Sequence, residues 1–109
     1  MIVQKEHAKF IRQGLKTQTR RTHKRPWRIG KTYRLKLNWY VTLKVQVVIL
    51  RRYRQRLGDM SLSEAQKEGY RTLQDFQEAW IKINGSWDPN LTVWVYEFKV
   101  IKNEEPEDT

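Results

Sequence analysis

The segment from Leu91 to Ile101 constrains the fold more than any other part of the chain. It is rich in β-branched and aromatic residues, which favour strands. Successive side chains of a strand point to opposite faces. One face would carry Val93 and Val95, and the other would carry Trp94, Tyr96, Phe98 and Val100. Because a strand with apolar residues on both faces needs cover on both, the segment is predicted to be a central strand.

The rest of the chain predicts further strands and short helices. Apolar and polar residues alternate over residues 33–37 and 41–49, which indicates two strands. Residues 4–13 predict an amphipathic helix that Gly14 ends, and two more helices open at Ser61 and Thr72. Ser61 and Glu64 have the spacing of a capping box, and Gly69 ends that helix. These elements predict an α+β domain, most simply a small, closed or nearly closed β barrel of mixed or antiparallel strands with the helices packed against it.

The length and the ends of the chain set the domain boundaries. A chain of 109 residues fits one domain, which we expect to span residues 1–102. Residues 103–109 are acidic, include Pro106 and are predicted to be a disordered tail. The chain has no apolar stretch near the ~20 residues that span a bilayer, and its first residues turn polar too early for a signal peptide. We therefore expect a cytoplasmic protein with no membrane partner, and a monomer is the starting assumption.

Charge is distributed unevenly along the chain. Residues 1–60 carry 17 Lys and Arg but 2 Asp and Glu, whereas residues 61–109 carry 5 and 10. A basic half of this density suits a polyanion partner, most simply nucleic acid, although a basic surface also serves solubility. Trp27 and Trp39 lie in the basic half, where exposed aromatic rings could stack on bases. The residues predicted to bind are Gly14, Arg20, Arg21, Lys24, Arg25, Trp27, Arg51, Arg52, Arg54 and Arg56.

The segment Gly14–Arg21 is the strongest candidate for a site. Lys16 lies among arginines, and neighbouring positive charge together with burial would lower its pKa, as a general base requires. Thr19 would be a nucleophile only with such a base within hydrogen-bond reach. In an extended strand the two side chains would point to opposite faces, so they converge only if the segment turns. The same residues could instead bind phosphate, or Lys16 could be a surface cation.

Other polar residues give weaker signals. Glu68 is predicted at the C-terminus of a helix, where the helix dipole disfavours negative charge. That local cost indicates either a functional role or an ordinary surface residue one turn after Glu64. His7 and His23 are predicted to lie at the surface, because the chain has no cysteine and few carboxylates near them. The sequence predicts no metal site and no cofactor.

Three blocks together resemble the ASCH domain, a branch of the PUA-like folds. The blocks are Gly14-x-Lys16-x-x-Thr19-x-Arg21, then Tyr53 to Met60 with Glu64-Ala65-x-x-Glu68-Gly69, and last Trp87-Asp88-Pro89 with Val93 to Phe98. They occur in this order, and the similarity covers nearly the whole chain except the acidic tail. The basic character is similar to that of small archaeal single-domain members.

The resemblance implies a PUA-like β barrel with a cleft and a function related to RNA. Some ASCH proteins are amidohydrolases that remove the acetyl group of N4-acetylcytidine with a lysine, a threonine and a glutamate, and another is a ribonuclease. The resemblance assigns the three hydrolase roles to Lys16, Thr19 and Glu68. We predict an RNA-binding domain with a basic cleft for RNA or a modified nucleoside. The alternative is the N4-acetylcytidine amidohydrolase, with Lys16 as the base, Thr19 as the nucleophile and Glu68 as the proton donor.

Overall fold

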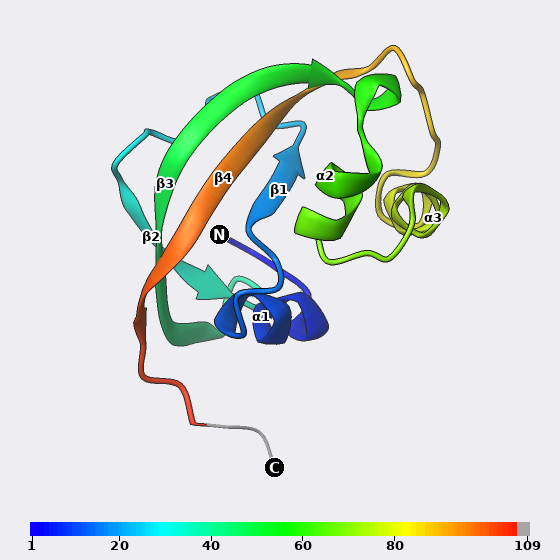
Figure 1. The fold of residues 1–109 in the computed structure, drawn as a ribbon. Helices are drawn as coiled ribbons and strands as arrows, with labels where there is room; N and C mark the ends of the chain where they lie inside the picture. The colour runs from blue at the N-terminus through cyan, green and yellow to red at the C-terminus, as the bar shows by residue number, and fades with distance from the viewer. Residues whose placement is uncertain (107–109) are drawn as a thin grey trace.

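The computed structural model describes residues 1–106, which form one sheet with three helices beside it (Figure 1). The helices are α1 (Lys5–Arg12), α2 (Leu62–Lys67) and α3 (Leu73–Asn84). The strands are β1 (Gln18–Arg21), β2 (Thr32–Lys36), β3 (Thr42–Arg56) and β4 (Thr92–Asn103), and a 3-10 turn spans Leu57–Asp59. None of the helices within the described range is long and apolar enough to cross a membrane.

The four strands form an antiparallel sheet in the order β1-β4-β3-β2. The two longest strands, β3 and β4, curve together, so that the sheet curls around α1 and the N-terminal segment (Figure 1). Ile2 adds a parallel bridge to Lys36 at the β2 edge. The predicted α+β fold is confirmed. The N-terminal segment, which the sequence did not predict to pair, lies along the β2 edge.

The central strand β4 separates two hydrophobic cores. Val93 and Val95 face a core that includes Phe76 and Trp80 of α3 and Ala65 of α2. The opposite side of β4 faces a second core, built with α1 and with the apolar residues of β2 and β3. The members of this second core on β4 are Tyr96 and Phe98, with Trp94 and Val100 packed against them. The prediction of a central strand covered on both faces is therefore confirmed.

Two parts of the sheet differ from the prediction. No strand was predicted over residues 18–21, but they form β1 and pair with β4 from Gln18↔Glu97 to Arg21↔Trp94. The tract 51–56 was expected after the end of a strand, but it belongs to β3 and pairs with β4 as far as Arg56↔Thr92. Both segments are polar and lack the apolar alternation that reveals a strand. Their pairing with the strongly β-forming β4 decides their conformation.

The predicted tail begins inside the sheet. Asn103 is the last residue of β4. The next two residues are hydrogen-bonded to Lys44. The N–H of Glu104 donates to the Lys44 carbonyl (2.8 Å), and the N–H of Lys44 donates to Glu105 Oε2 (2.7 Å). Arg12 Nη2 donates to the carbonyls of Glu105 and Pro106. Residues 103–106 thus contact the domain, whereas residues 107–109 lie outside the described residues.

Candidate functional site

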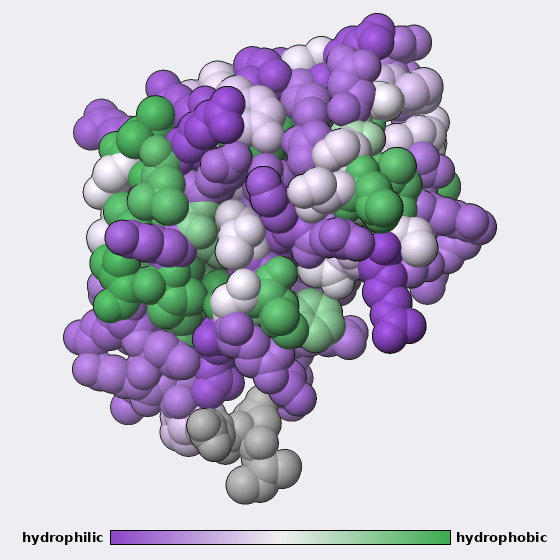
Figure 2. All heavy atoms as spheres, in the orientation of Figure 1, coloured by the Kyte–Doolittle hydropathy of each residue, from purple (hydrophilic) through white to green (hydrophobic). Residues whose placement is uncertain are grey.

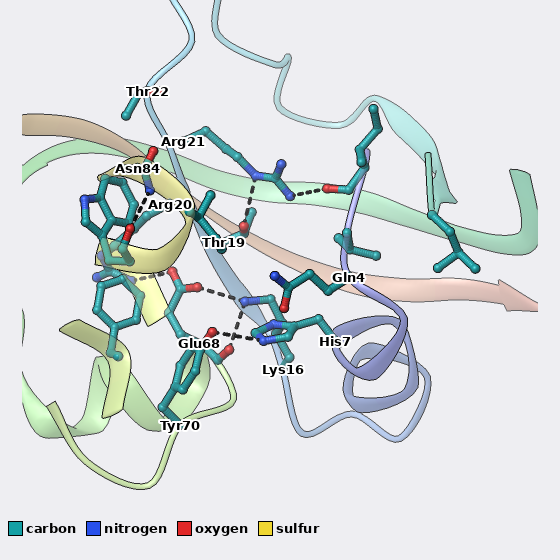
Figure 3. Close-up of a pocket in the computed structure, with 16 residues that line it drawn as sticks. Gln4, His7, Lys16, Thr19, Arg20, Arg21, Thr22, Glu68, Tyr70 and Asn84 are labelled. Carbon is teal, nitrogen blue, oxygen red and sulfur yellow. Dashed lines mark hydrogen bonds and ion pairs between the residues drawn. The ribbon is translucent and has the colours of Figure 1, made fainter. Parts of the chain in front are cut away.

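A cavity of about 420 Å³ lies between the N-terminal segment with α1, the strand β1, and the region of α2 and α3 (Figure 3). Its volume falls within the 300–1,000 Å³ that is typical of small-molecule sites. Apolar side chains including Val3, Phe76 and Trp80 form part of its wall. The sequence-predicted residues in the wall are Lys16, Thr19, Arg20, Arg21 and Glu68. All three residues of the predicted hydrolase set therefore line one cavity.

Lys16 and Glu68 are in direct contact. Lys16 Nζ donates to Glu68 Oε1 and to the Glu68 carbonyl oxygen, both at 2.8 Å, and each residue is less than 5% exposed. The approach is fixed by the backbone, because the N–H of Thr17 donates to the carbonyl of Lys67 (2.9 Å). Glu68 is the C-cap of α2, so the ammonium lies where the helix dipole favours a cation. This contact offsets the unfavourable position of the Glu68 carboxylate.

Arg20 holds the other oxygen of Glu68. Its Nη1 donates to Glu68 Oε2 (2.8 Å), and its Nη2 donates to Glu64 Oε2 (2.7 Å). Gln18 and Gln55 accept the remaining N–H groups, so all five donors of the guanidinium are used. The Arg20 side chain is fully buried. The sequence placed Arg20 among the RNA contacts, whereas in the structure all five of its donors are used and its guanidinium holds Glu68 and Glu64.

The buried position of Lys16 changes its acidity. Burial lowers the pKa of Lys16, and the charges of Arg21 and Arg20 lower it further, while the ion pair with Glu68 acts in the opposite direction. The first and largest cause is the loss of solvent. Lys16 thus has the environment expected for a lysine that can exchange a proton, with a carboxylate as its direct partner.

Thr19 reaches the cavity from β1. Its hydroxyl oxygen accepts a hydrogen bond from Arg21 Nε (3.2 Å), and Arg21 Nη2 donates to the carbonyl of Ile2 (2.9 Å). Lys16 lies before β1, outside the paired strand, so strict strand alternation does not set the relative directions of the two side chains. Among residues 1–106 no hydrogen bond joins Thr19 to Lys16. The two residues share a cavity wall without touching.

His7 and Tyr70 also line the cavity, and the sequence analysis missed both as site residues. His7 was expected at the surface, but it is partly buried and its Nε2 lies 3.0 Å from the Tyr70 hydroxyl. Gly69 allows this approach, because its φ is +99° and a Cβ there would lie 3.2 Å from the Phe10 ring. A side chain at position 69 would be strained at this φ and would require the Phe10 ring to shift.

A face of the sheet next to the cavity carries arginines and aromatic rings. Two rows of residues cross the strands β1, β4 and β3. One row is Thr19, Tyr96 and Arg52, and the other is Arg21, Trp94 and Arg54. Directly opposite residues of neighbouring strands lie on the same face. The guanidinium of Arg54 lies 4.8 Å from the centre of the Trp94 ring, and that of Arg52 lies 5.6 Å from it. We call these two rows the arginine face.

The other predicted binding residues are scattered. Trp27 packs against the core beside Tyr96 and lies under Arg21, at 5.2 Å from ring centre to guanidinium, so it is less open to bases than expected. Lys24 and Arg25 are exposed in the connection after β1. The remaining three lie elsewhere: Gly14 ends α1 with φ +76°, Arg51 pairs with Glu97 on the opposite face, and Arg56 pairs with Asp59. Within residues 1–106 no group of three or more His, Cys, Asp or Glu residues is arranged to hold a metal ion.

The protein resembles known proteins in its three-dimensional structure, and two solved structures illustrate this. The ASCH domain from Lactobacillus crispatus JV V101 superposes with a TM-score of 0.78 and 17% identity, over 90% of this chain and 72% of that one. A protein from Enterococcus faecalis V583 described by the family model DUF984 superposes with a TM-score of 0.72 and 13% identity, over 95% of this chain and 75% of that one. No family model and no curated protein matches the sequence. The chain therefore has the α+β fold of the ASCH domain.

Proposed function

We propose that the protein is an RNA-binding domain in which the arginine face holds the RNA backbone and the cavity receives one base or modified nucleoside. The observation that carries this proposal is that the arginine face and the cavity share residues. Thr19 and Arg21 belong both to the cavity wall and to the cross-strand rows that lead to Arg52 and Arg54. Thr19 and Tyr96 are buried within these rows. An RNA strand would therefore contact Arg54 and Arg52, the more exposed members, and a neighbouring base would reach the cavity.

The chemistry of the arginine face suits a single-stranded nucleic acid. Arginines bind phosphate, and aromatic rings with arginine planes stack on bases. Arg54 is exposed and Trp94 is partly buried, so a charge and part of an aromatic side chain are available. The molecular surface in the orientation of Figure 1 is mostly hydrophilic, and its apolar side chains form patches separated by polar ones (Figure 2). Such a surface fits a polar, charged ligand.

Arg54→Gln is expected to weaken the binding of single-stranded RNA and to make the slope of log K against log salt shallower by about 0.7, because one phosphate contact is lost. The matched control is Lys82→Gln, which removes the same charge from an exposed position on α3. Fluorescence anisotropy with a labelled RNA at several salt concentrations measures both quantities. Equal slopes for the two variants would contradict a backbone-binding role for the arginine face.

A second candidate function is hydrolysis of the amide bond in N4-acetylcytidine, and the buried contact between Lys16 and Glu68 favours it. For this reaction a proton must move from Lys16 to Glu68, which leaves a neutral amine and a neutral acid. The Thr19 hydroxyl would then attack the acetyl carbonyl carbon while Lys16 takes its proton. Glu68 would protonate N4 as the C–N bond breaks, and water would release acetate from the threonine ester. Thr19 must turn toward Lys16 for this step.

A further inference from the structure

The pair formed by His7 and Tyr70 has no role in either proposed function. His7 lies in the first turn of α1, and Tyr70 follows the end of α2, so the pair joins two segments that are distant in sequence. Their rings are tilted by 52° with centres 5.3 Å apart. Figure 3 shows both side chains beside the Lys16–Glu68 contact, with the His7–Tyr70 hydrogen bond on the same side of the cavity.

Both members of the pair are uncharged at neutral pH. Burial and the nearby charge of Lys16 lower the pKa of His7 to about 4, against a smaller opposing effect of Glu68. Burial and the negative charges of Glu68 and Glu6 raise the pKa of Tyr70 to about 12. In a hydrogen bond between a neutral imidazole and a phenol, either group can be the donor. The pair can therefore offer a ligand a donor or an acceptor without a change in its net charge.

Three cations and one carboxylate line the cavity wall, and the hydrogen bonds of Arg21 go to neutral groups. Lys16 and Arg20 both bind Glu68, and Arg21 donates to Thr19 and to the Ile2 carbonyl. The rest of the wall is uncharged, with Gln4 and Asn84 beside the apolar side chains. A ligand that enters the cavity meets ring faces, neutral hydrogen-bonding groups and the Arg21 guanidinium. The ring faces and neutral hydrogen-bonding groups of this wall suit a planar heterocycle.

We propose that His7 and Tyr70 are specificity-determining residues that hydrogen-bond the edge of an uncharged nucleobase held in the cavity. The inference rests on the proposed function, because it assumes that the cavity receives a base of a bound RNA. A site that hydrogen-bonds one base edge rejects a base whose edge leaves those groups unpaired. The arginine face then supplies affinity without sequence preference, and the pair supplies the preference.

Tyr70→Phe tests the proposal, because it removes the hydroxyl and keeps the ring that packs edge-on against Phe76. The matched control is Tyr53→Phe, which removes a hydroxyl bonded to Glu64 at a position outside the cavity wall. Affinities are measured for short single-stranded RNAs of one base type each, at several salt concentrations. We expect wild type to prefer one base by about 10-fold or more. Tyr70→Phe should abolish this preference with an unchanged salt slope, and Tyr53→Phe should keep it.

The outcomes separate the two proposals. If wild type binds RNA with a normal salt slope and Tyr70→Phe retains the full base preference, the role of the pair is wrong and the proposed function stands. RNA binding without any base preference in wild type would likewise overturn the role of the pair alone. No RNA binding by wild type would overturn both. His7→Phe, which keeps an aromatic ring and removes both ring nitrogens, should lose the preference in the same way as Tyr70→Phe.

Discussion

Replacing Arg20 with leucine is expected to lower the free energy of unfolding by about 3–5 kcal/mol, the cost of breaking a buried ion pair from one side. The variant leaves Glu68 with Lys16 alone and removes the ion pair of Glu64. The side-chain oxygens of Gln18 and Gln55 also lose the hydrogen bonds that they accept from Arg20. This loss is a large part of the 5–15 kcal/mol that stabilises an ordinary domain, so chemical denaturation measures it readily.

The matched control is Arg56→Leu, which breaks the exposed ion pair with Asp59. We expect little change in stability there, because solvent screens exposed pairs. Arg20→Lys should fall between the two, since it keeps the charge but cannot supply five donors in a fixed plane. A variant Arg20→Leu that unfolds at the same denaturant concentration as Arg56→Leu would contradict the structural role of the buried network.

Lys16→Met is expected to reduce cytidine release from N4-acetylcytidine by a factor of about 10²–10⁴, if the protein is an amidohydrolase. Methionine has a similar length but cannot take the proton of Thr19, and Glu68 keeps its ion pair with Arg20 at 2.8 Å. The fold should therefore persist. Chromatographic separation of substrate and product measures the turnover, and circular dichroism checks the fold.

Lys67→Met is the control for this experiment, because it removes an exposed lysine from the last turn of α2, next to Glu68 in sequence. It should leave turnover unchanged. Retained turnover in Lys16→Met would rule out Lys16 as the base. If wild-type protein releases no cytidine, amide hydrolysis of the free nucleoside is excluded and RNA binding remains the function to be tested.

The sequence predicted those parts of the fold whose cause is local. The two apolar sides of residues 91–101 made a central strand necessary, and the capping box of Ser61 and Glu64 forms as expected, with both hydrogen bonds at 3.1 Å. The strand β1 could not be predicted in this way. Its residues are polar, and the buried Arg20 is neutralised by Glu64 and Glu68, which lie 44 and 48 residues away in the sequence.

The candidate site shows the same division between local and distant causes. The segment Gly14–Arg21 and the odd position of Glu68 at a helix end singled out the residues that line the cavity. Their spacing could not show whether Lys16 reaches Glu68, since that contact depends on the Thr17–Lys67 hydrogen bond. His7 and Tyr70 are 63 residues apart, and neither lies in a recognisable pattern. Of the local signals, Gly69 was interpreted as a helix end, while its close approach to Phe10 became visible only in the structure.

The change in backbone amide chemical shifts on adding a short single-stranded RNA tests the proposed function most directly, and a protein of 13.3 kDa suits this method. We expect saturable changes in two regions that the proposal joins. These regions are the cavity wall at residues 16–21 and 68–70, and the arginine face at residues 52, 54 and 94. The absence of any saturable change at low salt, or changes confined to the outer side of α3 and the turn at residues 85–90, would contradict it.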